Sequence, residues 1–351
     1  MSDTIRVIQY GLGPIGSAMA RHVVERAGLE LVGGVDIDPA KVGQDVGEAI
    51  GLGRPLGCIV VEKLAQIEAD AAASSAASSH ARSGVRSGVV LHTTSSYFDQ
   101  FKNQVIEILE AGLDIVSTAE ELSFPWLAHP QEAAEIDAVA RRVGKTVLGT
   151  GVNPGFIMDS LPLSLTAICQ RVDRISVTRV INASTRRGPF QAKIGSGMTV
   201  DDFNARMAAG RMGHVGLPES VGMVFHTLGK KLTSYESSVE PVVAEQLVKT
   251  EHFEVSPGQV KGLKQVARAY TDEDELGSGN GFMTLTFIAA LDAENEGDTI
   301  EITGKPDLEV KLRGTNGDLA TVAIAVNAIR RVKQAAPGLV TMRDLPIVTV
   351  W

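Results

Sequence analysis

Short apolar runs alternate with amphipathic stretches through the first part of the chain. The apolar runs are IRVIQY (5–10), ELVGGVD (30–36), VVLHTTS (89–95) and DIVST (114–118). The amphipathic stretches cover residues 18–25, 103–112 and 130–144, and another apolar run follows the last of them. Strands that alternate with helices in this way predict an α/β fold, in which helices cover both faces of a doubly wound parallel sheet.

The pattern changes after residue 151. Strand-like runs at 174–181, 281–291, 298–304 and 307–314 predict a second, mostly antiparallel sheet. Helical stretches at 199–210 and 218–232 are expected to cover one face of it, and a long apolar helix is expected at 319–335. We therefore expect a first domain over 1–151, a second, α+β domain over 152–315, and a C-terminal helix and tail (316–351) that pack back on the first domain.

Composition and charge exclude several classes of partner. The net charge of −9 supplies no basic surface, so nucleic acid and membranes are not expected partners. A small molecule is the expected partner. Cys58 and Cys169 cannot form a disulfide framework, and no metal-ligand spacing is present. Without a signal-peptide pattern or an apolar run of membrane length, a cytoplasmic location is expected. The Ala- and Ser-rich segment 69–88 is interpreted as an inserted surface loop.

A glycine-rich motif joins the first predicted strand to the first predicted helix. Its residues are Gly11, Leu12, Gly13, Pro14, Ile15 and Gly16. This spacing permits a tight turn, close approach of the backbone to pyrophosphate and close packing of helix on strand, as in a Rossmann dinucleotide-binding site. Asp36 follows about 20 residues later, where a carboxylate can bind the ribose hydroxyls and favour NAD(H). Lys41 would still tolerate NADP(H). A turn that binds a different ligand is the alternative.

Polar residues also follow two later strands of the predicted parallel sheet. Thr94 and Ser95 come after one strand, and Thr118 and Ala119 after the next. Ligands bind outside the carboxyl ends of parallel strands. These four residues are therefore candidates to line the nicotinamide side of the cofactor site, through their backbone as much as their hydroxyl groups.

Glu120 and Glu121 follow directly at the same strand end, where a nicotinamide ring is expected. A carboxylate there can hold an ammonium ion, accept its proton to release ammonia, and stabilise an iminium cation. The alternative is that both glutamates are solvated or begin the next helix, since Glu is favoured in a first helical turn. On this hypothesis at least one of the two is catalytic, and the chemistry suits amines better than alcohols.

Four further residues are candidates for substrate binding. Asn153 offers an amide to substrate or cofactor, Phe156 and Met158 can line an apolar pocket, and His214 lies in a glycine-rich loop that could form a lid. Phe156 and Met158 are equally compatible with the core, and a lone loop histidine is more often structural. Arg186, Arg187 and Gln191 could bind a carboxylate, although a solvated basic face is the simpler interpretation.

Four segments together resemble 2,4-diaminopentanoate dehydrogenase and the related native amine dehydrogenases. They are RVIQYGLGPIGSAMAR, IVSTAEELSFP, GTGVNPGFIMDSLP and AAPGLVTMRDLP, and the resemblance extends over essentially the whole chain. It implies a Rossmann domain of the dihydrodipicolinate-reductase type, NAD(P) as cofactor, a homodimer, and interconversion of a ketone or aldehyde plus ammonia with an amine. It also implies that the catalytic glutamate is Glu120 or Glu121. Homoserine dehydrogenases carry TANK where this chain has TAEE, which reverses the charge of the site.

The leading hypothesis is reversible reductive amination of a small ketone or aldehyde, with a substrate like 2,4-diaminopentanoate as one possibility. A carbonyl or imine reductase of the same fold that needs no free ammonia is the alternative enzyme. A catalytically silent dinucleotide-binding protein is the alternative from another class.

Overall fold

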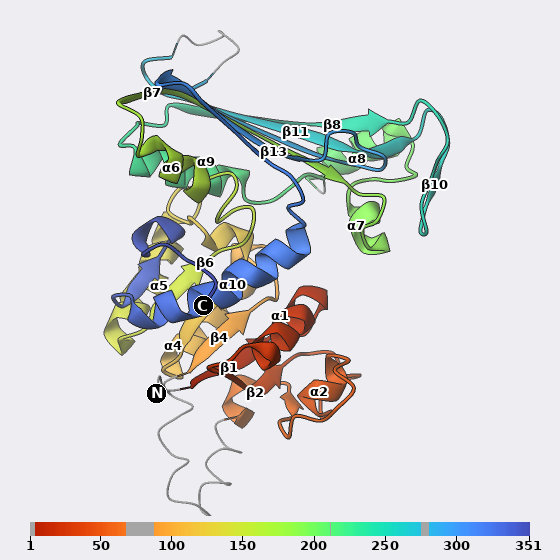
Figure 1. Ribbon diagram of the computed structural model, residues 1–351. Coiled ribbons are helices and arrows are strands. Elements are labelled where there is room, and N and C mark those ends of the chain that lie inside the picture. Colours follow the sequence, from red (N-terminus) through yellow and green to blue (C-terminus); the bar gives the residue numbers. More distant parts are fainter. Residues whose placement is uncertain (1–3, 68–87, 211, 275–280) are drawn as a thin grey trace, which may run out of the picture. The chain divides into compact units, whose positions relative to one another are not determined.

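The computed structural model describes residues 4–67, 88–210, 212–274 and 281–351. Residues 69–87 of the segment interpreted as an inserted loop lie outside these ranges. The chain folds into two compact units. The nucleotide unit, as we name it, comprises Met1–Phe156 and Asn316–Trp351, and the sheet unit comprises Ile157–Thr315 (Figure 1).

A seven-stranded sheet forms the centre of the nucleotide unit, in the order β15-β6-β5-β4-β1-β2-β3. All its neighbouring strands are parallel, which confirms the predicted fold class. The strands are β1 (Ile5–Tyr10), β2 (Leu29–Val35), β3 (Val60–Val61), β4 (Val89–His92), β5 (Asp114–Ser117), β6 (Thr146–Gly149) and β15 (Gly338–Val340). Sequence analysis did not predict β15, because three residues behind Pro337 carry too short a pattern to separate a strand from a tail.

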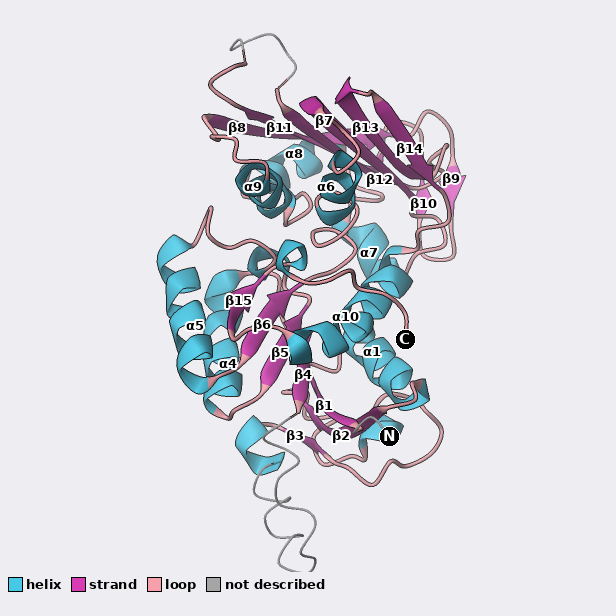
Figure 2. Cartoon of the chain, turned by 60° about the vertical axis from the view of Figure 1, so that its left-hand side comes forward, coloured by secondary structure: helices cyan, strands magenta, loops and turns pink. Residues whose placement is uncertain are grey.

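Helices cover both faces of this sheet. On one face, α1 (Pro14–Glu25) and α10 (Gly317–Gln334) lie side by side and share an apolar core with the strands. On the other, α4 (Phe98–Glu110) and α5 (Pro130–Val143) pack in a second apolar core (Figure 2). Two short helices of the unit are α2 (Val46–Ala49) and the 3-10 helix η3 (Met342–Asp344), and another, η2, belongs to the site.

A six-stranded sheet forms the sheet unit, in the order β14-β13-β7-β12-β11-β8. Only the pair β12–β7 is parallel, so the expected mostly antiparallel sheet is confirmed. The strands are β7 (Arg171–Asn182), β8 (Ser234–Val243), β11 (Val260–Tyr270), β12 (Met283–Ala290), β13 (Gly297–Lys305) and β14 (Leu308–Leu312). A separate hairpin pairs β9 (Val248–Lys249) with β10 (Glu254–Val255).

Three helices of the sheet unit pack against this sheet, namely α6 (Ser160–Thr166), α8 (Val200–Ala208) and α9 (Leu217–Thr227), and they lie along one face of it (Figure 1). A short α7 (Gly188–Lys193) follows β7. The stretch expected to be helical to residue 232 ends at Thr227, because Gly229 adopts a left-handed φ of +65° and closes the helix.

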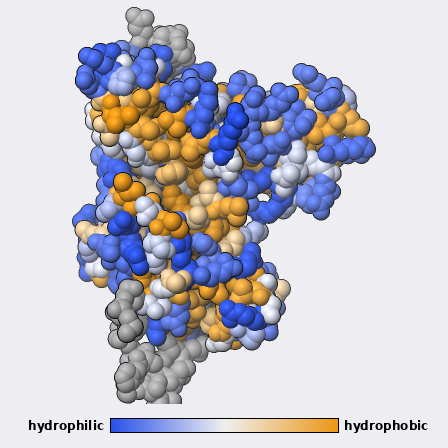
Figure 3. All heavy atoms as spheres, in the orientation of Figure 1, coloured by the Kyte–Doolittle hydropathy of each residue, from blue (hydrophilic) through white to orange (hydrophobic). Residues whose placement is uncertain are grey.

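Apolar and hydrophilic residues are interspersed on the surface drawn in Figure 3. The most exposed large apolar side chains are those of Ile37, which follows β2, and of Ile347 and Val350, which lie close together in the C-terminal tail. Within the described ranges, no helix is long and apolar enough to cross a membrane.

A buried carboxylate ties α10 to the parallel sheet. Asp114, at the start of β5, accepts the backbone N–H of Thr146 at 2.9 Å and the ammonium of Lys333 at 2.8 Å. The side chain of Asp114 is only 8% exposed. Because Lys333 belongs to α10, this contact joins the C-terminal segment to strands formed far earlier in the chain.

We expect Asp114→Ala to lower the free energy of unfolding by about 2–4 kcal/mol, since the Lys333 ammonium and the Thr146 N–H lose their common acceptor. The matched control is Glu254→Ala, which breaks the exposed Lys249–Glu254 pair and should change that free energy by less than about 1 kcal/mol. Urea titration of each variant measures both effects. Equal losses in the two variants would contradict a stabilising role for Asp114.

Candidate active site

The carboxyl ends of four neighbouring strands meet in one register row. Tyr10 of β1 pairs with His92 of β4, His92 pairs with Ser117 of β5, and Ser117 pairs with Gly149 of β6. The segments that follow these residues carry the glycine motif, the two Thr/Ser loop residues, the glutamates and Asn153. The structure thus brings together, at one edge of one sheet, most of the candidates found in the sequence.

The three glycines of the motif occupy three different environments. Gly11 has φ +89°, and a Cβ there would lie 2.5 Å from the carbonyl oxygen of Thr93. A Cβ on Gly16 would lie 1.9 Å from the carbonyl oxygen of Gly11, so α1 can approach the turn only with glycine at this position. A Cβ on Gly13 would meet nothing within 4 Å. Space therefore remains in front of Gly13, at the beginning of α1.

Two polar residues that were not predicted from the sequence hold this turn through hydrogen bonds to its backbone. The fully buried Gln9 donates from Nε2 to the carbonyl oxygens of Gly11 and Leu91, both at 3.1 Å. The Thr93 hydroxyl donates to the Gly11 carbonyl oxygen at 2.8 Å. A glutamine inside the apolar run IRVIQY was the available signal, because a buried amide needs hydrogen-bond partners.

The N-terminus of α1 is open to a ligand. Gly13 is its N-cap and has no side chain to accept the first amides, and the exposed Pro14 is the first helical residue. Leu12 is buried and Ile15 packs against the apolar core, so these two residues anchor the turn by their side chains. Unsatisfied amides and the helix dipole together favour an anion such as a phosphate at this position.

Asp36 lies directly beside the glycine turn. Its Oδ2 accepts the N–H of Leu12 at 2.6 Å and lies 3.4 Å from Nζ of Lys41. Lys41 in turn donates to the carbonyl oxygen of Leu12 at 3.0 Å and lies 3.4 Å from Asp38. A carboxylate and an ammonium group therefore stand next to each other at the end of β2.

His92, at the end of β4, organises the next two segments. Its Nδ1 lies 2.9 Å from the Ser117 hydroxyl, and its Nε2 lies 2.8 Å from Oε1 of Gln104. Ser117 Oγ accepts the N–H of Ala119 at 3.1 Å. Burial lowers the pKa of His92 to about 4, although the hydrogen bond with Gln104 acts in the opposite direction. The ring is therefore neutral near pH 7 and serves as an uncharged connector.

The loop residues predicted from the sequence bind their own surroundings through their hydroxyl groups. Thr94 donates to Gln104 at 2.7 Å, and Ser95 donates to Gln100 at 2.7 Å. Thr118 donates its backbone N–H to the His92 carbonyl oxygen at 3.0 Å, and Ala119 is buried. These contacts fix the backbone of both loops, so any ligand contact by Thr94 or Ser95 competes with an existing hydrogen bond.

The two glutamates have different environments. They open a 3-10 helix, η2 (Glu120–Leu122), behind β5. The carboxylate of Glu121 accepts the N–H of Phe98, the first residue of α4, at 2.5 Å, and lies 3.5 Å from Nε2 of His129. The N-cap residue of α4, Tyr97, supplies no side-chain cap, so Glu121 takes that role. Glu120 is half-buried.

The segment behind β6 holds buried polar atoms that lack partners. Thr150 is 2% exposed and Asn153 is 8% exposed. Within the described part of the chain, Thr150 Oγ1 and both polar side-chain atoms of Asn153 have no hydrogen-bond partner. Phe156, the last residue of this segment, is 37% exposed. Sequence analysis singled out Asn153 and Phe156 but missed Thr150.

The remaining candidates belong to the sheet unit. Met158 is fully buried. His214 donates its backbone N–H to Gln265 at 2.6 Å and stacks on Phe287 with ring centroids 4.6 Å apart.

The basic cluster predicted behind β7 has its own internal contacts. The Arg186 guanidinium lies over the ring of Phe190, 4.5 Å from its centroid. Arg187 is the N-cap of α7. Gln191 is fully buried, donates to the carbonyl oxygens of Ser184 and Arg186, and accepts from Thr250.

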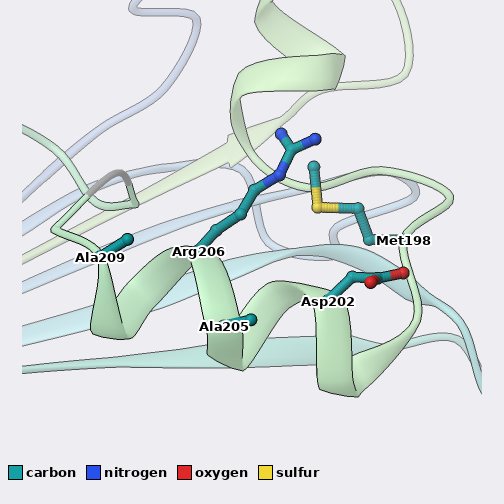
Figure 4. Close-up of a pocket in the computed structure, with 5 residues that line it drawn as sticks. All are labelled: Met198, Asp202, Ala205, Arg206 and Ala209. Carbon is teal, nitrogen blue, oxygen red and sulfur yellow. The ribbon is translucent and has the colours of Figure 1, made fainter.

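A hollow of about 420 Å³ lies along α8 of the sheet unit. Its lining residues are Met198, Asp202, Ala205, Arg206 and Ala209; the middle three project from α8 and Ala209 is the C-cap of that helix (Figure 4). None of the residues predicted from the sequence lines it. We therefore place the candidate active site at the carboxyl edge of the parallel sheet.

The doubly wound sheet and its glycine-rich turn place the chain among the Rossmann-type dehydrogenases. Residues 156–351 match the family model described as the 2,4-diaminopentanoate dehydrogenase C-terminal domain. The chain is 30% identical to the 2,4-diaminopentanoate dehydrogenase of Acetoanaerobium sticklandii, over 98% of this chain and 94% of that protein. It therefore belongs to the 2,4-diaminopentanoate dehydrogenase family and is an oxidoreductase, which confirms the resemblance seen in the sequence.

Two solved structures show the same architecture. The amine dehydrogenase from Mycobacterium smegmatis has a TM-score of 0.82 at 25% identity, covering 100% of this chain and 98% of that one. The myo-inositol dehydrogenase from Lactobacillus casei, in complex with NAD(H) and myo-inositol, has a TM-score of 0.56 at 15% identity, covering 97% of this chain and 90% of that one. The second likeness concerns the fold alone.

The buried, neutral His92 should make stability depend on pH. An unfolded histidine has a pKa of about 6.5, whereas that of His92 is lowered to about 4 in the folded state. The unfolded chain therefore binds this proton more readily, and the free energy of unfolding should fall as the pH drops from about 6.5 to about 4. Urea titrations at several pH values should show a shallower fall for His92→Gln than for the unaltered protein. His252→Gln, at an exposed position, is the control, and an unchanged pH profile in His92→Gln would refute the assignment.

Proposed function

We propose that this protein is an NAD(H)-dependent amine dehydrogenase, which reversibly converts a small ketone or aldehyde and ammonia into an amine. The observation that carries the proposal is the position of Glu120. Glu120 follows the end of β5, at the same edge of the sheet where the glycine turn follows β1, and its neighbour Glu121 serves as the cap of α4. The relatives named amine dehydrogenase and 2,4-diaminopentanoate dehydrogenase support the same class of substrate.

The residues of the glycine turn fit a dinucleotide. The open space before Gly13 and the uncapped amides of α1 would receive the pyrophosphate, and Asp36 would bind the adenosine ribose hydroxyls. Asp36 favours NAD(H) because its carboxylate repels a ribose phosphate. Lys41, 3.4 Å from Asp36, could instead pair with that phosphate, so NADP(H) is the second cofactor to test. When bound, the nicotinamide supplies the hydride or takes it up.

The Glu120 carboxylate would perform the proton chemistry. It accepts a proton from ammonium, and the ammonia released adds to the substrate carbonyl carbon to give a carbinolamine. The protonated Glu120 then returns the proton to the departing hydroxyl group, so that water leaves and an iminium cation forms beside the carboxylate. Hydride addition to the iminium carbon gives the amine. The same steps in reverse deaminate an amine oxidatively.

Glu121 would act as a positioning residue for this carboxylate. Its bond to the N–H of Phe98 fixes η2 against α4, and the His92–Ser117–Ala119 contacts fix the strand end from which η2 begins. Glu120 is thereby held between two anchored points of the backbone. A carboxylate whose backbone is fixed loses little freedom when it binds its substrate.

The partners in this proposal are small molecules, namely the carbonyl or amine substrate and ammonia. Asn153, Phe156, Met158 and His214 stay candidates for substrate contact. A homodimer and a cytoplasmic location stay proposals: the first rests on the family resemblance, and the second on the sequence patterns described above.

Glu120→Gln should reduce kcat for reductive amination at least about 100-fold, because glutamine cannot accept the ammonium proton. NADH affinity, measured by fluorescence titration, should stay the same, since Glu120 lies outside the glycine turn. Glu121→Gln keeps an oxygen that can accept the Phe98 N–H, and should retain a kcat within about tenfold of the unaltered protein. Full activity in both variants would refute the catalytic assignment, and loss of activity in Glu121→Gln alone would show that Glu121 performs the proton transfer.

A further inference from the structure

We propose that Thr150 and Asn153 form the subsite that binds the carboxamide of the cofactor's nicotinamide. The inference rests on the proposed function, because it assumes that a nicotinamide dinucleotide binds at the glycine turn. It adds Thr150 to the site and gives Asn153 one defined role, namely to orient the ring through its carboxamide.

Unsatisfied polar atoms are the first observation behind this subsite. Thr150 Oγ1, Asn153 Oδ1 and Asn153 Nδ2 are buried and have no hydrogen-bond partner among the described residues. The neighbouring buried side chains of His92 and Ser117, at the ends of β4 and β5, are hydrogen-bonded. A buried polar atom without a partner costs free energy, so such a group requires an explanation. Partners supplied by a bound ligand would provide it.

The local backbone holds these atoms in place. The N–H of Thr150 donates to the Ser117 carbonyl oxygen at 2.8 Å, which sets Thr150 beside the strand end that leads to Glu120. The chain then folds back on itself and brings Gly155 (φ +118°) close to Thr150. A Cβ on Gly155 would lie 2.8 Å from Thr150 Oγ1. The N–H of Val152 donates to Thr321 of α10 at 3.3 Å. The turn is therefore fixed to β5 at one point and to α10 at another.

The chemistry of the orphan atoms selects the ligand group. Asn153 presents one acceptor and two N–H donors without charge, and Thr150 can donate or accept. A carboxamide carries both a carbonyl acceptor and N–H donors, so it can satisfy both ends of Asn153. A ketone offers only an acceptor, and an ammonium ion offers only donors. A carboxamide matches this set of atoms better than either form of the substrate.

The strand order agrees with this assignment. The proposed ribose-binding Asp36 follows β2 and the proposed pyrophosphate site follows β1, whereas Thr150 follows β6, across β4 and β5 in the sheet. A dinucleotide in a Rossmann fold extends across the carboxyl edge of the sheet from its adenosine half to its nicotinamide half. The orphan atoms thus lie on the side where the nicotinamide half is expected.

Two threonines, Thr146 at the start of β6 and Thr150 directly after its last residue, provide a matched test. Thr150→Val removes an orphan hydroxyl, whereas Thr146→Val removes a hydroxyl that donates to the Ala336 carbonyl oxygen at 3.1 Å. Without cofactor, we expect the melting temperature of Thr150→Val to equal or exceed that of the unaltered protein, and that of Thr146→Val to fall. With cofactor, NADH affinity by calorimetric titration should fall roughly tenfold in Thr150→Val and Asn153→Leu and stay unchanged in Thr146→Val.

Cofactor analogues separate this subsite from a general effect on the fold. ADP-ribose lacks the nicotinamide and should bind Thr150→Val, Asn153→Leu and the unaltered protein equally. The 3-acetylpyridine analogue of NAD lacks the amide N–H donors, so it should bind the unaltered protein more weakly than NAD, and Asn153→Leu should abolish the difference. Unchanged NADH affinity in both variants, or a parallel loss of ADP-ribose binding, would overturn the subsite while leaving the proposed function intact. If the unaltered protein bound neither NADH nor ADP-ribose, the proposed function itself would fail, and the subsite with it.

Discussion

The close approach of α1 to the ends of β1 and β4 is the constraint on which the rest of the site depends. It requires glycine at position 16, where a Cβ would lie 1.9 Å from the carbonyl oxygen of Gly11. Gln9 and Thr93 both donate hydrogen bonds to that carbonyl oxygen. Because the turn is fixed in this way, the amides of α1 face the open space before Gly13, and Asp36 can reach the N–H of Leu12. The turn that we propose binds the dinucleotide is therefore held in place by contacts within the protein.

A second set of contacts prepares the proposed chemistry at the neighbouring strands. Neutral His92 connects β4 to β5 through Ser117, and Glu121 connects η2 to α4. One glutamate of the adjacent pair thus caps a helix, and the proposed function assigns proton transfer to the other, Glu120. The two glutamates can have different environments because adjacent residues in a tight 3-10 turn project in different directions.

Much of this arrangement could be predicted from the sequence, because it depends on local patterns. Glycine spacing and strand order place Gly11, Asp36 and the glutamates at one edge of a parallel sheet. The capping role of Glu121 could not be predicted, since the cap joins Glu121 to Phe98, 23 residues away. Thr150 was missed for a similar reason, because its significance comes from burial without a partner, and a threonine between glycines carries no such signal in the sequence.

The central claim, that this site aminates carbonyl compounds, is tested most directly by following NADH consumption with a panel of small ketones and aldehydes as the ammonium concentration rises. The account predicts a rate that increases with ammonium and falls to background without it. Oxidation of NADH by the same ketones at an equal rate without ammonium would contradict the account, and would identify the protein as a carbonyl reductase of this fold.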